Sequence, residues 1–405
     1  MGIERAAVER VVIAGGGFAG LAAGIALAAK GCQVEVYERA DESRELFAGV
    51  VLSPNGIVAA DLLSPELGRR LRELGEANPA DVAYPMVDHR GRVLSAQPPG
   101  DLVAQWGAPL QTIFRDEAHG AVLRAASDCG VKVFTGRTVT GFSQDPGGVV
   151  VLLSDGGVTD ADLLVGADGA YSTVRAQLLG DGPPRYCGYS SVRGVLTDPR
   201  VLAEYRRTFP IGSMCGGRGV HICMAVLPGN RLYWSAVIKA AAGEWPAKDG
   251  ATAKADLLAR LSGWVAPVRE MITATDPDVL VALDIVDRDP RPPWSRGRVV
   301  LVGDAAHPMT PALGQGINTS FEDAVVLAGA LAAARTVDEA LAAYEAERLP
   351  RCTKVVKQSR MIANMATVRN PVGAWLRDRS MTMVSKMFDP DAANRMLYAY
   401  RPSTR

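Results

Sequence analysis

Residues 11–38 read VVIAGGGFAGLAAGIALAAKGCQVEVYE: an apolar strand, a glycine-rich turn, a helix of small residues and a second strand that ends in an acid. Gly15, Gly17 and Gly20 form a GxGxxG pattern at the turn. The first glycine permits the tight turn, the second lets the backbone approach a pyrophosphate, and the third lets the helix pack closely on the strand. The stretch therefore predicts a βαβ unit that holds an ADP group.

The helix predicted over residues 18–30 directs its N-terminal N–H groups and the positive end of its dipole at the phosphates. Glu38 lies 18 residues after Gly20, where a carboxylate can accept hydrogen bonds from ribose hydroxyls. A GxGxxG pattern alone also serves plain packing of a helix on a strand. The strand, the helix and the acid together favour a nucleotide, which at this point is either FAD or NAD(P).

Composition narrows the class of protein. The chain has 405 residues, and 44 Lys and Arg balance 44 Asp and Glu, which disfavours nucleic acid and anionic membranes as partners. The six cysteines include no Cys-x-x-Cys pair, and the four histidines lack the spacing of metal ligands. We therefore expect reduced thiols, no metal site and a cytoplasmic location. No apolar run approaches about 20 residues, so no membrane span is expected. The expected partner is a small molecule.

Two further features are ambiguous when read alone. Residues 161–175 form an apolar strand that delivers Asp168 into a sharp turn before a helix, the geometry of a strand end that faces a ligand. An ordinary Asp-Gly turn with Ser172 as the helix cap explains the same residues. Arg115 heads an amphipathic helix, where a solvated charge is the more common role.

A second lobe is indicated where the periodicity changes. Residues 184–286 form short alternating strands joined by Gly, Pro and Asn turns, which predicts an antiparallel sheet with one buried face. A hairpin over 81–95 and two helices, over 251–261 and 264–274, are expected to complete this lobe. A substrate is expected to bind on it.

The doubly wound pattern returns at residues 297–324, GRVVLVGDAAHPMTPALGQGINTSFEDA. An apolar strand ends in Gly303 and Asp304, and a second glycine-rich turn precedes a helix over 317–334. Two glycine-rich helix starts indicate a cofactor with two ends that need backbone donors. FAD, with its pyrophosphate and its isoalloxazine carbonyl, fits this better than NAD(P). For His307, we expect a role in packing at least as much as a role in chemistry.

The remaining chain is helical by pattern, over 338–368 and 371–398. Interruptions are predicted at Pro350 and at Asn370-Pro371, because proline removes a helical hydrogen bond and clashes with the preceding turn.

The ordered motifs GGGFAG, GADGAYSTVR, YCGYSSVRG and GDAAHPMTPALGQGINTSFEDA, with Glu38 and Arg115, resemble the single-component (class A) FAD-dependent aromatic hydroxylases. This family includes salicylate and para-hydroxybenzoate hydroxylases and TetX-like monooxygenases. The resemblance spans nearly the whole chain. It implies an α/β fold with a Rossmann-like FAD/NAD(P)-binding lobe, an antiparallel β-sheet substrate lobe and a C-terminal helical segment.

The resemblance also implies domain limits. A discontinuous FAD-binding domain is expected over 1–80, 105–180 and 287–340. The substrate domain is expected over 81–104 and 181–286, and C-terminal helices over 341–405.

Site residues follow from the same resemblance, which implies non-covalent FAD. The pyrophosphate is assigned to the first glycine turn, the ribose to Glu38, the ribityl hydroxyls to Asp304, and the isoalloxazine to Pro311 and the 314–318 backbone. Arg115 becomes an FAD contact, and Asp168 is placed near FAD and the pyridine nucleotide. The implied cofactor residues are Gly15, Gly17, Phe18, Ala19, Gly20, Glu38, Arg39, Arg115, Asp168, Gly303, Asp304, Pro311, Gly314, Gln315, Gly316, Ile317 and Asn318.

Two segments depart from the family pattern. His119-Gly120 stand where many relatives have apolar residues, and the 47–50 segment FAGV lacks the usual Gly-Ala-Gly form. Both leave the local geometry open.

The implied reaction uses NADPH or NADH and O2 to hydroxylate or epoxidise an aromatic or polyunsaturated substrate through a flavin C4a-hydroperoxide. The pyridine nucleotide is expected to bind transiently, because the chain has one dinucleotide fingerprint. Arg193, Met224, Tyr233 and Pro311 are the candidates for the substrate pocket, and no catalytic base is identified. The protein is expected to be a monomer or a homodimer.

Three other functions are compatible with parts of the sequence to different degrees. A flavin halogenase would need a Trp-x-Trp-x-Ile-Pro stretch, and the six tryptophans include no such pair. A flavin reductase or oxidase of a natural-product intermediate remains an alternative. A flavin-binding protein without catalysis ranks last, because the glycine-rich 303–318 loop is complete.

Overall fold

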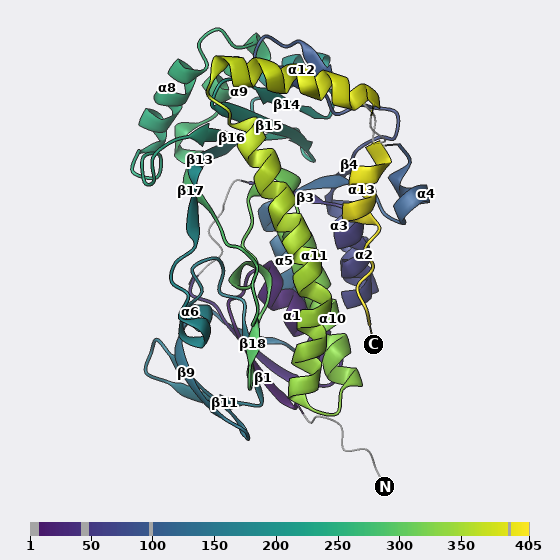
Figure 1. The fold of residues 1–405 in the computed structure, drawn as a ribbon, viewed down its shortest axis with the longest axis vertical. Helices are drawn as coiled ribbons and strands as arrows, with labels where there is room; N and C mark the ends of the chain where they lie inside the picture. The colour runs from purple at the N-terminus through teal and green to yellow at the C-terminus, as the bar shows by residue number, and fades with distance from the viewer. Residues whose placement is uncertain (1–7, 42–47, 97–99, 388–389, 405) are drawn as a thin grey trace.

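The computed structural model describes residues 8–41, 48–96, 100–387 and 390–404. Two lobes are stacked along the long axis of the molecule, and the long helix α11 (Val337–Ala366) runs from one to the other (Figure 1). Among the described residues, no helix is long and apolar enough to cross a membrane. All six cysteines are unpaired thiols.

The Rossmann-like lobe is built on a six-stranded sheet in the order β18-β19-β12-β1-β2-β8. All neighbouring strands are parallel except β18, which pairs antiparallel at one edge. Residues 11–14 of the central strand are buried, as expected for a parallel strand covered on both faces. The strands are β1 (Arg10–Ala14), β2 (Gln33–Tyr37), β8 (Lys132–Phe134), β12 (Leu163–Gly166), β18 (Ser295–Arg296) and β19 (Val299–Leu301).

Helices and two small sheets surround this core. The helix α1 packs against both α10 and α5, and α2 packs against α10. The helices are α1 (Phe18–Ala28), α2 (Pro54–Leu63), α3 (Pro65–Leu74), α4 (Leu102–Trp106), α5 (Arg115–Asp128), α6 (Thr173–Leu179) and α10 (Gly316–Ala333). The small sheets are β11-β10-β9 (Val158–Ala161, Gly148–Leu153, Val139–Asp145) and β3-β7-β4 (Gly49–Leu52, Gln111–Phe114, Glu76–Ala77).

The second lobe is a seven-stranded sheet in the order β17-β13-β16-β15-β14-β5-β6. The predicted hairpin near residue 90 forms its outer edge, and β5 pairs parallel to β14. The strands are β5 (Met86–Asp88), β6 (Val93–Ser95), β13 (Arg185–Leu196), β14 (Gly212–Gly216), β15 (Val220–Leu227), β16 (Arg231–Lys239) and β17 (Val281–Asp287).

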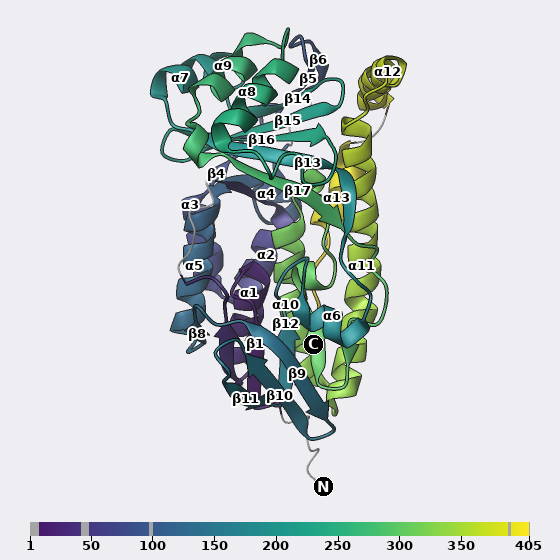
Figure 2. The ribbon, with the colours of Figure 1, turned by 90° about the vertical axis from the view of Figure 1, so that its left-hand side faces the viewer.

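Three helices cover one face of this sheet: α7 (Pro199–Thr208), α8 (Gly250–Arg260) and α9 (Ala266–Ala274) (Figure 2). The helices α8 and α9 lie at the predicted positions, whereas α7 was not predicted. Asp198 caps α7 by accepting hydrogen bonds from the N–H groups of Arg200 and Val201. Trp234 and Met224 point to the helix-covered face and belong to its buried core.

The helix α11 contradicts the interruption predicted at Pro350, because it continues through that residue from Val337 to Ala366. Proline removes one hydrogen bond, but buried side chains before and after it, including Arg348 and Cys352, fix the helix by tertiary contacts. The expected boundary between 340 and 341 lies inside α11, which packs along α10. The domain limits stay a prediction.

The predicted break at Asn370-Pro371 is present. The helix α12 (Pro371–Met387) begins there, and α13 (Pro390–Tyr398) follows. The C-terminal segment returns to the Rossmann-like lobe, where Leu397 and Tyr398 pack with Leu102 and Val355.

Candidate active site

Two helices of the Rossmann-like lobe begin at glycine-rich turns without a side-chain cap. The N-cap of α1 is Gly17, which has no side chain, and that of α10 is Gln315, whose side chain accepts no helix N–H. A Cβ atom added to Gly17 or Gly316 would meet nothing within 4 Å. The space beside both glycines is therefore open, and a helix N-terminus favours negatively charged or carbonyl groups.

The GxGxxG turn has the predicted close packing. Gly15 has a φ of 103°, and its N–H donates to the carbonyl oxygen of Tyr37 at 2.8 Å. A Cβ atom on Gly20 would overlap the carbonyl oxygen of Gly15, so only glycine lets α1 lie this close to β1.

Glu38 lies directly beside this turn. Its Oε2 accepts the N–H of Gly16 at 2.7 Å, and its Oε1 accepts the N–H of Ala40 at 2.9 Å. The carboxylate is half-buried, whereas Arg39 is exposed. Each carboxylate oxygen keeps further acceptor capacity, so the position suits a ribose hydroxyl.

His119 explains one departure from the family pattern. Its Nε2 lies 2.8 Å from the carbonyl oxygen of Gly16, and its ring packs edge-on against Phe18 with 5.5 Å between centroids. The polar side chain of His119 therefore connects α5 to the glycine turn. The other departure includes residue 47, which lies outside the described residues.

Arg115 and Asp304 carry opposite charges at the same site. The Arg115 guanidinium lies 5.4 Å from the Phe18 ring centroid, and burial, with Arg193 as a second cause, lowers its pKa. Asp304, in a turn of 3-10 helix (Gly303–Ala305), is solvent-accessible, yet burial raises its pKa. Asp304 accepts no hydrogen bond from any described residue.

Asp168 forms hydrogen bonds at the start of α6, and its expected place near FAD and the pyridine nucleotide stays a prediction. Its carboxylate accepts the N–H groups of Thr173 at 2.7 Å and Val174 at 3.1 Å, together with the Ser172 hydroxyl. The side chain thus caps α6, as in the ordinary Asp-Gly turn. Its backbone lies next to Gly15, where an added Cβ would approach the Asp168 Cα.

The side chain of Asn318 holds the second glycine-rich loop. Its Oδ1 accepts the N–H of Ser53 at 2.9 Å, and its Nδ2 donates to the carbonyl oxygens of Gly314 at 2.7 Å and Val51 at 3.1 Å. Gln315 Nε2 donates to the Ser53 hydroxyl at 3.0 Å. These side chains position the loop, so the backbone N–H groups at the α10 N-terminus remain available.

Three other predicted residues surround this loop. Pro311, which begins a short 3-10 helix (Pro311–Leu313), is exposed, and Ile317 is half-buried. Gly303 packs against Ala19, because an added Cβ would lie 2.6 Å from the Ala19 Cβ. The turn at Gly303 and the first glycine-rich turn are therefore neighbours in space although about 280 residues apart in sequence.

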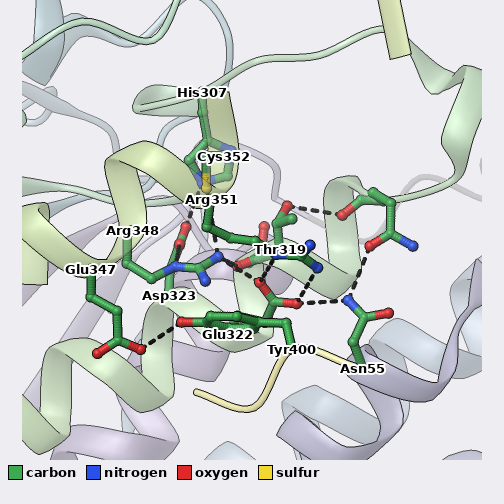
Figure 3. A network of polar contacts seen from close by, with 12 residues as sticks. Asn55, His307, Thr319, Glu322, Asp323, Glu347, Arg348, Arg351, Cys352 and Tyr400 are labelled. Atoms are coloured by element: carbon green, nitrogen blue, oxygen red, sulfur yellow. Dashed lines mark hydrogen bonds and ion pairs between the residues drawn. The ribbon is translucent and has the colours of Figure 1, made fainter. Parts of the chain in front are cut away.

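A buried polar network supports the second loop from behind (Figure 3). Asp323 accepts the N–H of Gly303 at 2.9 Å, His307 Nε2 at 2.6 Å and Arg348 Nε at 2.7 Å. Burial lowers the pKa of His307, but the Asp323 carboxylate more than reverses this and leaves it well above the ordinary value. The turn that presents Asp304 is thus fixed by charge-assisted hydrogen bonds.

Glu322 extends the network toward α2. Its carboxylate lies 2.8 Å from Arg348 Nη2 and 3.1 Å from Arg351 Nη2, and it accepts Asn55 Nδ2 at 2.7 Å. These residues were missed in the sequence. The sequence signal for them is the pair of adjacent acids at 322 and 323 in an otherwise uncharged helix. Such acids, when buried, require positively charged or hydrogen-bonding partners.

The same network contains His307, Asp323 and Cys352, whose potential metal-binding atoms lie within 4.8 Å of one another. His307 and Asp323 bind each other directly, and Arg348 Nη2 lies 3.6 Å from the Cys352 sulfur. A guanidinium beside the three side chains identifies them as an ion-pair network.

The second lobe faces this site with the uncovered side of its sheet. Tyr233 is half-buried on this side, and an added Cβ on Gly49 would lie 2.9 Å from its ring. Arg193 is also half-buried there, and its Nε has no hydrogen-bond partner. Met224 points the other way, into the core, because neighbouring strand residues alternate between faces, so it is not part of this surface.

Comparisons with known proteins agree with this geometry. Residues 9–359 match the family model described as "FAD binding domain". The aurachin C monooxygenase/isomerase of Stigmatella aurantiaca is 36% identical over 375 residues, which are 93% of this chain and 94% of that protein. The 3-amino-4-hydroxybenzoate 2-monooxygenase of Streptomyces cremeus is 32% identical over 92% of this chain and 91% of its own.

Solved structures show the same fold. HpxO of Klebsiella pneumoniae, complexed with FAD and uric acid, matches with a TM-score of 0.84 at 28% identity over 94% of each chain. A salicylate hydroxylase substrate complex matches with a TM-score of 0.74 at 22% identity over 98% of this chain and 99% of its own. The chain therefore belongs to the FAD-binding-domain family of aromatic monooxygenases and is an enzyme with FAD as its cofactor.

Proposed function

We propose that this enzyme uses NAD(P)H and O2 to hydroxylate, or epoxidise, an electron-rich aromatic small molecule that binds between Tyr233 and the N-terminus of α10. The observation that carries the proposal is the juxtaposition of two uncapped glycine-rich helix starts with the uncovered face of the second sheet. The names of the relatives, which include hydroxylases of benzoate-type and nicotinate-type compounds, support an aromatic substrate.

The residues present fit FAD, because the two free helix N-termini, the accessible Asp304 carboxylate and Glu38 match the polar groups along an extended dinucleotide. The first glycine turn would hold the pyrophosphate and Glu38 the adenosine ribose. Asp304 would bind the ribityl hydroxyls, with Arg115 nearby.

When bound, FAD supplies hydride acceptance from NAD(P)H and activation of O2 for transfer to carbon. The chain contributes position and electrostatics. The N–H groups of Gly316, Ile317 and Asn318, with the dipole of α10, would stabilise negative charge on the pyrimidine side of the ring. The Asn318 and Gln315 side chains keep these donors aligned before the reaction begins.

Purified holoenzyme incubated with NADPH or NADH, a panel of phenols and isotopically labelled oxygen gas tests the proposal. The expected result is ligand-stimulated NAD(P)H oxidation with one labelled oxygen atom in the product. Product without the label would assign a reductase or oxidase. NAD(P)H oxidation that no aromatic ligand changes would favour a flavin-binding protein without catalysis.

A further inference from the structure

The uncovered face of the seven-stranded sheet is a continuous, partly accessible surface. Its side chains alternate with fully buried core residues along β13, β15 and β16. The half-buried residues on it are Arg193, Tyr233, Ser235, Cys223, His221 and Met214. Cross-strand pairing places Ser235 between Arg193 and Cys223, and Cys223 beside Met214.

The chemistry of this surface changes along its length. Burial raises the pKa of the Cys223 thiol and lowers that of His221 to about 4, although both side chains are partly accessible. His221 is consequently uncharged near neutral pH. At the other end, Arg193 forms no ion pair with a described acid, so the charge on this face is concentrated near Tyr233 and the predicted flavin position.

The distal end of the surface opens into a pocket of about 60 Å³ with an almost entirely apolar lining. Met86 and Met214 come from the sheet, Ile362 and Met365 from α11, and Met381 from α12. Methionine side chains are flexible and fill irregular spaces, so a pocket with four of them adapts to an apolar guest.

The charged residues at this pocket are already satisfied by the protein. Arg377 lies 2.8 Å from the Asp378 carboxylate and donates to the carbonyl oxygens of Gly217 at 3.3 Å and Ala366 at 3.1 Å. The pocket therefore presents mainly carbon and sulfur to a ligand, with the imidazole of His221 as a further lining group, and its two charged residues are paired with each other.

The pocket lies within reach of the proposed reaction site. Tyr233 pairs with Ala225, which pairs with Gly212, and Met214 follows two residues along that strand. Two strand spacings across and two residues along the sheet correspond to about 12 Å. The Tyr84 hydroxyl lies on this path, 3.3 Å from the Cys223 sulfur, and donates to the carbonyl oxygen of Met224 at 2.8 Å. A ring held near Tyr233 would project a substituent of that length past Tyr84 to the methionines.

We propose that the methionine pocket binds an aliphatic substituent of the substrate, which makes the substrate an amphiphile with an aromatic head and an apolar tail. The inference rests on the proposed function for the placement of the head. The continuity of the sheet face from Tyr233 to Met214 identifies the tail as part of the substrate.

The test uses FAD-loaded enzyme and 4-n-alkylphenols with chains from one to nine carbons. Binding is measured from the change in the flavin absorption spectrum and from the methyl signals of ε-¹³C-methionine. Affinity is expected to rise about threefold to fourfold per methylene until the chain fills the pocket. The signals of Met86, Met214, Met365 and Met381 should shift with the longer phenols.

Two matched variants on α11 test whether the gain in affinity arises in the pocket. Met365 lines the pocket and is 39% exposed, whereas Met361, one helical turn earlier on α11, is 55% exposed and does not line it. Met365→Gln is expected to weaken nonylphenol binding roughly tenfold and methylphenol binding little, because the amide would be desolvated by the tail. Met361→Gln should change neither.

The outcomes separate the two proposals. Affinity that is independent of chain length, equal effects of the two variants, or unshifted pocket methionines at saturating nonylphenol overturns the tail site, even if short phenols are hydroxylated. Failure of every phenol to bind also overturns it. Chain-length-dependent binding without labelled product retains the tail site and contradicts the proposed monooxygenation.

Discussion

The two sides of the active site are formed by side chains of different chemistry. Behind the α10 N-terminus, on the cofactor side, buried acids and arginines form direct ion pairs, with Arg348 between Glu322 and Asp323. On the sheet side, the surface toward the site carries Tyr233, Cys223, His221 and methionine. One side is fixed by charge-assisted hydrogen bonds, and the other, apart from Arg193, is lined by adaptable, weakly polar side chains.

The difference reflects the two ligands. A cofactor has a constant pattern of phosphates, hydroxyls and ring carbonyls, so rigid donors aligned in advance stabilise it without reorganisation. A substrate surface can vary in shape within one fold, and soft side chains tolerate such variation. Mutations on the cofactor side should consequently affect stability and FAD binding more than mutations on the sheet side.

The largest effect is expected for Asp323→Asn. Removing this charge leaves Arg348 and His307 buried without their carboxylate, and breaking such a pair costs about 3 to 5 kcal/mol. Urea unfolding of the FAD-free protein measures the change. The control Asp338→Asn alters an exposed acid on α11 and should change the free energy of unfolding by less than about 0.5 kcal/mol. Equal values for both variants would contradict a stabilising network.

Asp304→Ala should weaken FAD binding roughly tenfold to a hundredfold, since hydrogen bonds to a charged group contribute about 1.5 to 3 kcal/mol. The measurement is the flavin absorbance retained per protein after dialysis, with fluorescence titration of the apoprotein. Asp278→Ala, an exposed acid in the second lobe, is the control. A fully yellow Asp304→Ala protein would show that the ribityl chain is held elsewhere.

On the sheet side, His221→Gln should reduce the acid sensitivity of folding. Burial and the nearby Arg377 lower the pKa of His221 to about 4, so the folded state binds fewer protons than the unfolded state between that pH and about 6.5. Stability from this residue is present above pH about 6.5 and is lost as the pH falls toward 4. For a partly accessible side chain we expect a loss of about 2 kcal/mol.

Urea midpoints measured from pH 7 to pH 4 check this prediction. The wild-type free energy of unfolding should fall more steeply than that of His221→Gln. The substitution His89→Gln, at a half-buried turn of the same lobe, provides the control. Parallel curves for wild type and His221→Gln would mean that His221 is protonated normally in the folded protein.

The smallest effect is expected for Glu38→Ala, which should weaken FAD binding about threefold to tenfold through loss of the ribose acceptor. The carboxylate also orders the turn by accepting the Gly16 N–H. Glu38→Gln keeps one such acceptor, so its affinity should lie between those of wild type and Glu38→Ala. Fluorescence titration with FAD measures all three, and identical affinities would remove Glu38 from the ribose site.

Much of the fold was predictable because its signals are local. The apolar run that begins the 11–38 stretch forms β1, and α1, α8, α9 and α10 differ from expectation by about two residues or fewer. The helix α7 was missed, because its short amphipathic sequence follows a long strand and begins at an Asp-Pro pair that also suits a turn.

The site was predicted less completely. Its glycines, Glu38 and Asp304 lie where sequence spacing and family resemblance placed them, and their roles toward FAD stay predictions. The side chains of Asp168 and Met224 point to α6 and to the core, respectively. The supporting acids and arginines were not foreseen, because their pairing depends on helices that approach only in the folded protein.

The sequence by itself determined the βαβ nucleotide motif, the alternating second sheet and the glycine-rich start of α10, since each depends on residues within one or two neighbouring elements. Only the tertiary structure decided that α11 passes through Pro350, that Arg348 pairs with both Glu322 and Asp323, and that methionines from the sheet, α11 and α12 form one pocket. These features join residues distant in the chain, and their energy comes from burial and charge pairing that no local pattern encodes.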